Sequence, residues 1–123
     1  MSFEFRLLKA KPDEAVFVWL DDRRPPPGEN WLWVKTPEDT IELLQSRSVT
    51  VLSLDHDLGL LDREPEATGY DVVLWIEAQV ATAGFVPPEV ITVHSSNSSA
   101  APKMERGIAS IRRLYEQRLQ QTQ

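Results

Sequence analysis

Three short polar segments combine side chains that can bind cations and move protons, and each directly follows an apolar run. They read DDRR after Leu20, DHD after Leu54 and HSSN after Val93. Their candidate functional residues are Asp21, Asp22, Arg24, Asp55, His56, Asp57, His94, Ser95 and Asn97. Both histidines of the protein belong to this set. The sequence therefore gathers its acid–base groups and many of its carboxylates at three places along the chain.

Carboxylates that lie close together repel one another, so they need a cation, a shared proton or basic neighbours. Oxygen ligands suit Mg²⁺ or Ca²⁺, and an added imidazole widens the choice to Mn²⁺, Zn²⁺ or Fe²⁺. In an extended strand Asp55 and Asp57 point the same way, whereas Asp21 and Asp22 diverge, so we expect one residue of the second pair to ligate directly. We predict a divalent cation, Mg²⁺ or Mn²⁺ first with Zn²⁺ as an alternative. Its ligands come from Asp21, Asp22, Asp55 and Asp57.

Structural roles compete with these chemical ones. An Asp after a strand often caps a turn, and Ser98 and Ser99 are the residues we expect to cap the last helix. Ser95 and Asn97 either cap that helix or orient His94 by hydrogen bonding. Arg24 either neutralises the acidic residues or binds a phosphate. We expect the tryptophans to be core residues rather than base-stacking platforms: Trp19, Trp31, Trp33 and Trp75.

Apolar runs at 15–20, 31–34, 49–54 and 90–93 predict strands. The first and third runs are apolar almost throughout, which favours strands covered on both faces. A weaker signal at 3–8 suggests an edge strand. Helices are predicted to begin at Thr36, near Thr68 and near Ser99. Asp71 completes a capping box with Thr68, and Gly84 ends that second helix.

Strands that alternate with helices predict an α/β fold with a mainly parallel sheet of four or five strands. In such a sheet every strand points the same way, so the three polar segments emerge together at the carboxyl edge, where ligands bind in open α/β folds. The segment from Asp21 to Asn30 is too short and too rich in proline for a full crossover helix. No strand carrying a lysine is evident after the run at 90–93.

The composition predicts one intracellular domain. The chain has 123 residues, no cysteine and a net charge of −6. This length suits a single domain spanning 1–123, with a polar tail that frays from about residue 118. No signal peptide or run of about 20 apolar residues is evident, so we expect a cytoplasmic protein without a membrane partner. The acidity opposes broad nucleic-acid binding, which depends on Lys and Arg, but allows one phosphate or one RNA end in a local pocket.

The motifs LDDRRPPP, SLDHDLG, TGYDVVLWI and VHSSN…M resemble, in this order, the cyclic-phosphate-processing receiver-like domain, a divergent relative of two-component receiver domains. The resemblance runs from Val18 to Met104. It implies a receiver/flavodoxin-like three-layer sandwich that acts on cyclic phosphates, such as those at RNA ends. It assigns the nine polar residues named above to the site. The loop 98–101 departs from the family, because it lacks the Gly and basic residue often found there.

These observations favour a metal-assisted phosphoesterase that opens an RNA 2′,3′-cyclic phosphate end or a cyclic nucleotide. Asp55 and its acidic neighbours would hold the metal, His56 or His94 would supply the proton, and Arg24, with Ser95 and Asn97, would bind the phosphate. A metal-free mechanism would use the two histidines as an acid–base pair. Two alternatives are a signalling module with Asp55 as phosphoacceptor and a non-catalytic binder of phosphorylated ligands. The sequence leaves the oligomeric state open.

Overall fold

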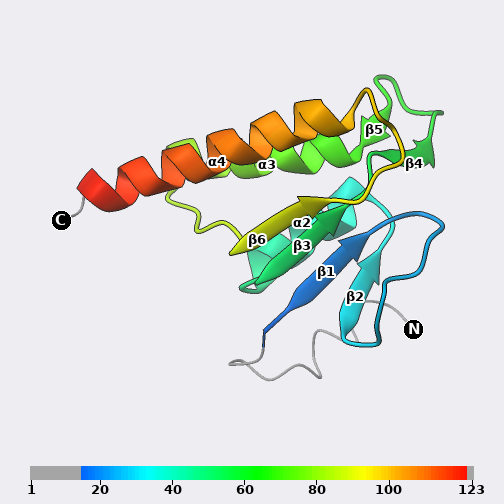
Figure 1. The fold of residues 1–123 in the computed structure, drawn as a ribbon, viewed down its shortest axis with the longest axis horizontal. Coiled ribbons are helices and arrows are strands. Elements are labelled where there is room, and N and C mark those ends of the chain that lie inside the picture. Colours follow the sequence, from blue (N-terminus) through cyan, green and yellow to red (C-terminus); the bar gives the residue numbers. More distant parts are fainter. Residues whose placement is uncertain (1–14, 122–123) are drawn as a thin grey trace.

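The fold is built on a four-stranded parallel sheet with the strand order β2-β1-β3-β6. A computed structural model describes residues 15–121 (Figure 1). The strands are β1 (Phe17–Leu20), β2 (Trp31–Val34), β3 (Val51–Leu54) and β6 (Val90–Val93). The predicted parallel sheet is confirmed, although β1 and β3 each begin two residues later than expected. The edge strand suggested at 3–8 falls outside the described residues.

The register brings the strand ends to one level. Leu20 pairs with both Val34 and Leu54, and Leu54 pairs with Val93. The residues that follow continue the ladder, because Asp55 N–H donates to the Leu20 carbonyl and His94 N–H donates to the Leu54 carbonyl. The predicted meeting of the polar segments at one edge of the sheet is therefore confirmed.

Helices α2 (Pro37–Ser46) and α3 (Gly69–Thr82) begin where the capping residues indicated. The Thr36 hydroxyl accepts from Asp39 N–H at 3.1 Å, and Thr68 and Asp71 form the full capping box. Gly84 has a φ of 70°, in the left-handed region that favours glycine after a helix. These local signals decided both helix starts and the end of α3.

Helix α4 (Ala101–Gln121) starts two residues later than expected and runs to Gln121, through the segment from residue 118 that we expected to fray. It lies beside α3, and its residues Met104, Ile108 and Ile111 are buried (Figure 1). No strand follows β6 among residues 15–121.

The two faces of the sheet differ. Alternate residues of β1 and β2, beginning with Val18 and Leu32, are buried in one core with the helices. The other residues of these strands are half-buried aromatics, namely Phe17, Trp19, Trp31 and Trp33. The expected cover on both faces of β1 is thus complete on the core face and partial on the aromatic face, as far as residues 15–121 show. On that face the aromatic rings contact one another. Trp31 meets Phe17 in a tilted arrangement with centroids 5.3 Å apart, and it meets Trp19 edge-on with centroids 5.6 Å apart.

A short hairpin, which we did not predict, connects β3 to α3. Its strands are β4 (Asp57–Leu60) and β5 (Ala67–Thr68), which pair antiparallel with Asp57 opposite Thr68. Gly59 adopts a φ of 68° within β4. The hairpin begins directly after Asp55 and His56, so it stands beside the candidate site.

Candidate functional site

Three carboxylates converge at the carboxyl edge of the sheet. Asp21, Asp22 and Asp55 each offer an oxygen, and these oxygens lie within 4.8 Å of one another. Asp21 is only 1% exposed and Asp55 only 8%. We expected Asp21 and Asp22 to diverge, but the chain leaves β1 at Leu20 and turns, so the alternation of an extended strand no longer applies. Both residues therefore face the cluster.

The turn after β1 is organised by the Asp21 side chain. Its Oδ1 accepts from the backbone N–H groups of Arg23 and Arg24 at 2.9 Å and 2.8 Å. Burial opposes ionisation of this carboxyl, but these two donors and His94 outweigh it and hold the pKa of Asp21 below its usual value. Asp21 is thus an ionised carboxylate that also fixes the backbone of the loop.

Asp55 behaves in the opposite way. Burial raises the pKa of this carboxyl, and the negative charge of Asp21 adds to the shift. Hydrogen bonds from His56 N–H, at 2.8 Å, and from the Ser95 hydroxyl only partly compensate. The folded protein is therefore destabilised when Asp55 is ionised, and a bound cation would remove this electrostatic penalty.

His94 is fixed by three neighbours. Its Nε2 lies 3.1 Å from Asp21 Oδ2, its Nδ1 lies 2.7 Å from the Ser53 hydroxyl, and its ring stacks on Trp19 with centroids 3.7 Å apart. Because an ionised carboxylate only accepts hydrogen bonds, Nε2 carries the proton and the Ser53 hydroxyl donates to Nδ1. Thr92 in turn donates to Ser53 at 3.2 Å.

This arrangement keeps His94 neutral, since burial lowers its pKa more than Asp21 and Asp55 raise it. The expectation that Ser95 and Asn97 orient the ring is wrong. Sequence reasoning missed Ser53, which lies in the middle of β3 and faces the same side of the sheet as Trp19. The signal was a lone hydroxyl residue inside an otherwise apolar strand.

Two tryptophans are hydrogen-bonded to the loop that follows β1, here called the acidic loop, rather than only filling the core. The indole N–H of Trp33 donates to the Asp21 carbonyl at 2.7 Å, and that of Trp19 donates to the Arg24 carbonyl at 2.9 Å. A half-buried indole needs a partner for its N–H, and both partners here belong to the loop that carries the carboxylates. Trp19 thus contacts both His94 and the loop.

His56 and Asp57 form a second, more exposed pair. His56 Nδ1 lies 2.7 Å from Asp57 Oδ1, and Asn97 donates to the same oxygen at 3.2 Å. Asp57 does not belong to the group of converging carboxylates, because β3 ends at Leu54 and Asp57 begins β4. The hydrogen bonds from His56 and Asn97 outweigh partial burial and hold the pKa of Asp57 below its usual value.

Asn97 also caps the last helix. Its Oδ1 accepts from the backbone N–H groups of Ser99 and Ala100 at 3.1 Å and 3.0 Å. The expectation that Ser98 and Ser99 provide this cap is wrong. Ser95 bonds to Asp55 and accepts from Asn97 N–H at 3.0 Å. Ser95 and Asn97 therefore tie the loop after β6 to the two acidic residues of the β3 loop.

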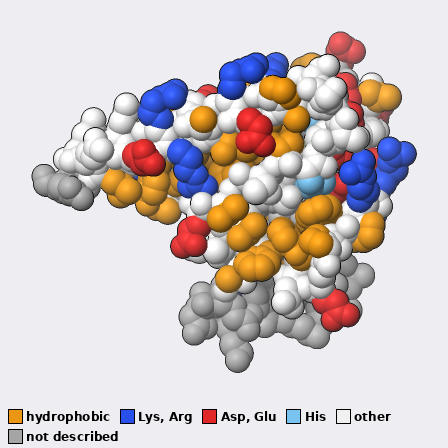
Figure 2. All heavy atoms as spheres, in the orientation of Figure 1, with side chains coloured by type: hydrophobic (Ala, Val, Ile, Leu, Met, Phe, Trp, Pro, Cys, Tyr) orange, Lys and Arg blue, Asp and Glu red, His pale blue; other side chains and the backbone are white. Residues whose placement is uncertain are grey.

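Arg24 is exposed at the same edge, and its positive charge adds to the effects that disfavour protonated His94. In Figure 2 histidine, acidic and basic side chains lie together at the end of the molecule toward which the strand arrows of Figure 1 point. Gly69 allows the close packing beneath the site, because a Cβ there would overlap the Asp55 carbonyl oxygen. This contact explains the glycine of the TGYD motif.

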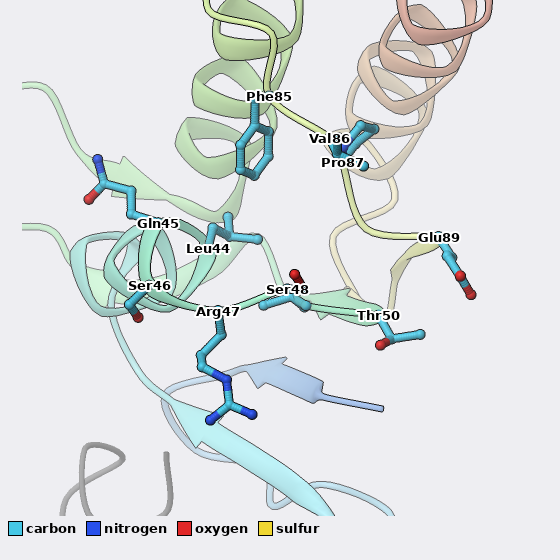
Figure 3. Close-up of a pocket in the computed structure, with 11 residues that line it drawn as sticks. Leu44, Gln45, Ser46, Arg47, Ser48, Thr50, Phe85, Val86, Pro87 and Glu89 are labelled. Atoms are coloured by element: carbon cyan, nitrogen blue, oxygen red, sulfur yellow. The ribbon is translucent and has the colours of Figure 1, made fainter. Parts of the chain in front are cut away.

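Two open hollows can be compared as ligand sites. One, of about 500 Å³, adjoins the carboxylates and includes Asp22, Asp57 and Gly59 in its lining. The other, of about 450 Å³, lies at the opposite edge, between the end of α2 and the segment that leads into β6 (Figure 3). Its lining includes Arg47 and Glu89 but none of the converging carboxylates. The first hollow is therefore the better candidate for substrate.

Comparison with known proteins identifies one family. The model of a family described as the cyclic-phosphate processing receiver domain matches residues 16–110. No curated protein and no solved structure gave a significant match. Within residues 15–121, none of the helices combines the length and apolar character needed to cross a membrane. The match covers most of the chain and all nine predicted site residues, so this chain belongs to the cyclic-phosphate processing receiver domain family.

Proposed function

We propose that this protein hydrolyses a cyclic phosphodiester at the carboxyl edge of its sheet, with a divalent cation held by Asp21, Asp22 and Asp55. The observation that carries the proposal is the approach of these three carboxylates to within 4.8 Å, two of them almost fully buried. The family association with cyclic-phosphate processing supplies the substrate class.

The donor set fits a hard cation. All three groups are carboxylate oxygens, and both nitrogens of His94 are engaged by Asp21 and Ser53. Oxygen donors favour Mg²⁺ or Mn²⁺ over Zn²⁺, which prefers nitrogen and sulfur. The raised pKa of Asp55 also fits, because the fold leaves negative charge there that nothing nearby fully balances. When bound, such a cation supplies charge neutralisation on phosphorus and a more acidic water.

His56 is the better proton carrier of the two histidines. Asp57 engages its Nδ1, and Nε2 has no hydrogen-bond partner among residues 15–121. In ring opening, a water oxygen forms a bond to phosphorus while one ester P–O bond breaks. One water proton is lost to solvent. His56 in its protonated form gives its Nε2 proton to the leaving oxygen, while its Nδ1–H stays bonded to Asp57. His94 instead orients Asp21, which changes the direct catalytic role that we expected for it.

Arg24 is the residue that we assign to the phosphate. Its guanidinium is exposed beside the cluster, whereas its backbone is fixed by Asp21 and Trp19. A guanidinium can donate two parallel hydrogen bonds to phosphate oxygens. Ser95 and Asn97 are assigned to loop positioning, because their side chains already bond to Asp55, Asp57 and the start of α4.

The test is turnover of nucleoside 2′,3′-cyclic phosphates with Mg²⁺ or Mn²⁺, followed by phosphorus NMR. We expect ring opening by the wild type and a rate roughly 10²- to 10⁴-fold lower for His56→Ala. Ser96→Ala, at an exposed position in the loop after β6, is the matched control and should keep the wild-type rate. Metal-dependent turnover that survives in His56→Ala would reassign the proton carrier, and absence of turnover with every substrate and metal would refute hydrolysis.

A signalling role is favoured by one observation, namely that Asp55 directly follows β3, one of the two inner strands, beside two further carboxylates. It predicts a stoichiometric phosphoryl adduct after incubation with acetyl phosphate and Mg²⁺, detectable by intact mass and absent in Asp55→Asn. Hydrolysis predicts no lasting adduct. A non-catalytic binder predicts affinity for cyclic phosphates without turnover.

A further inference from the structure

The hollow beside the carboxylates has walls of known chemistry. Its lining consists of Asp22, Arg23, Asp57, Gly59, Leu61 and Glu66. It lies between the loop that follows β1 and the β4–β5 hairpin, and its volume of about 500 Å³ falls within the range of small-molecule sites. Asp22 belongs both to this lining and to the proposed cation site. A substrate whose phosphate is bound there would extend its organic part into the hollow.

The hairpin wall is held at its base and near its tip. At the base, Asp57 pairs with Thr68 and Gly69 N–H donates to the His56 carbonyl at 3.0 Å. Near the tip, Arg63 donates to both carboxylate oxygens of Glu38, at 2.8 Å and 2.7 Å. The wall is therefore formed without a ligand.

The hairpin also passes directly over the edge of the acidic cluster. A Cβ on Gly59 would lie 3.0 Å from Asp22 Oδ2, and the residue has a positive φ. Glycine thus lets the backbone of β4 approach the carboxylate closely. The hollow and the cation site are neighbouring parts of one surface.

The charge of the walls limits what can enter. Asp22, Asp57 and Glu66 are acidic, and Arg23 is the one basic residue of the lining. Binding of a nucleic-acid backbone depends on Lys and Arg that neutralise successive phosphates. A second phosphate in this hollow would face carboxylates, in a protein whose net charge is −6. The same carboxylates can accept hydrogen bonds from amino and hydroxyl groups, and Leu61, which is 76% exposed, offers apolar surface.

We propose that the hollow binds the neutral nucleoside part of a nucleoside cyclic monophosphate and disfavours chains that carry further phosphates. This inference rests on the proposed function and narrows its substrate from RNA ends and cyclic nucleotides to the mononucleotides. Glu66 is the specificity-determining residue, because it adds negative charge to the wall without belonging to the cation site or to the His56 pair.

The test compares one nucleoside 2′,3′-cyclic phosphate with a pentanucleotide that ends in the same cyclic phosphate. We expect a higher kcat/KM for the mononucleotide, with a difference that shrinks as salt is raised. Glu66→Lys should shift the preference toward the pentanucleotide by about fivefold, the size of one exposed charge contact. Glu116→Lys, exposed on α4 and equal in charge change, is the control and should leave the preference unaltered.

Calorimetric affinities of the same two ligands for His56→Ala give a second reading that does not need turnover. Tighter binding of the mononucleotide supports the inference even if hydrolysis fails. The inference would be overturned if kcat/KM and affinity for the pentanucleotide equal or exceed those for the mononucleotide and Glu66→Lys has no effect. The proposal of hydrolysis would then still stand. Absence of all turnover with selective mononucleotide binding would overturn hydrolysis alone.

Discussion

Replacing Asp55 by Asn should stabilise the metal-free protein, although Asp55 is central to the proposed site. Two charges no more than 4.8 Å apart repel by at least about 3 kcal/mol at an effective dielectric constant of about 20. An asparagine removes this repulsion from Asp21 and keeps an oxygen that accepts from His56 N–H. It loses about 1 kcal/mol because the remaining hydrogen bonds no longer involve a charge. We therefore expect a gain of about 1–3 kcal/mol in the free energy of unfolding.

The pH dependence follows from the sign of the pKa shift. The pKa of Asp55 is raised in the folded state, so its contribution is most favourable below about pH 4, where the carboxyl is protonated in both states. That contribution is lost as the pH rises through the raised folded pKa. The advantage of Asp55→Asn should thus be small near pH 4 and should grow as the pH rises through the raised pKa.

Urea unfolding in EDTA at several pH values measures this directly, with Asp57→Asn as the control. Asp57 is exposed and outside the carboxylate cluster, so the control should show little change or a slight loss. Saturating Mg²⁺ or Mn²⁺ should offset most or all of the advantage of Asp55→Asn, because a ligand at a hundredfold excess over its Kd stabilises the wild type by about 2.7 kcal/mol. A lower stability of Asp55→Asn in EDTA at pH 7 would show that the carboxylates are not in repulsive contact.

Three further changes probe the supports of the site. Ser53→Ala leaves the half-buried Nδ1 of His94 without its donor. We expect the free energy of unfolding in urea to fall by about 1–3 kcal/mol and cation binding measured by calorimetry to weaken. An unchanged cation affinity would argue against positioning through His94. Gly69→Ala should destabilise by about 1–3 kcal/mol despite the better helix propensity of alanine, because the methyl group overlaps a backbone oxygen; a gain in melting temperature would contradict this. Trp19→Phe keeps a ring against His94 but loses the indole bond to the acidic loop, so we expect about 1 kcal/mol lower stability, and an unchanged melting temperature would show that bond to be unimportant.

The sequence predicted those features that depend on local chemistry or strand direction. The capping pair Thr68 and Asp71 predicted the start of α3. The apolar runs that precede Asp21, Asp55 and His94 predicted that these three residues meet at one edge of the sheet. Asp22 was among the predicted ligands, but its convergence together with Asp21 was not predicted. It depends on a turn in which Asp21 binds backbone N–H groups two and three residues ahead. Such a turn has no simple periodicity.

The contacts of His94 were missed for a different reason. Ser53 lies 41 residues before it in the chain, and the pair forms only through the register of β3 against β6. The indole bonds of Trp19 and Trp33 likewise depend on how the loop folds back over the sheet. Residue types suggested a site at this edge, but the tertiary register decides which residues react and which position them.

Ring opening in water enriched in ¹⁸O tests the central claim most directly. A nucleoside 2′,3′-cyclic phosphate is incubated with the protein and Mg²⁺ or Mn²⁺, and the product and the intact protein are both weighed by mass spectrometry. We expect a phosphomonoester that carries one ¹⁸O atom on phosphorus, an unmodified protein, and loss of the reaction in EDTA and in Asp55→Asn. An unreacted cyclic phosphate under all metal conditions, or a phosphorylated protein that accumulates in place of product, would contradict it.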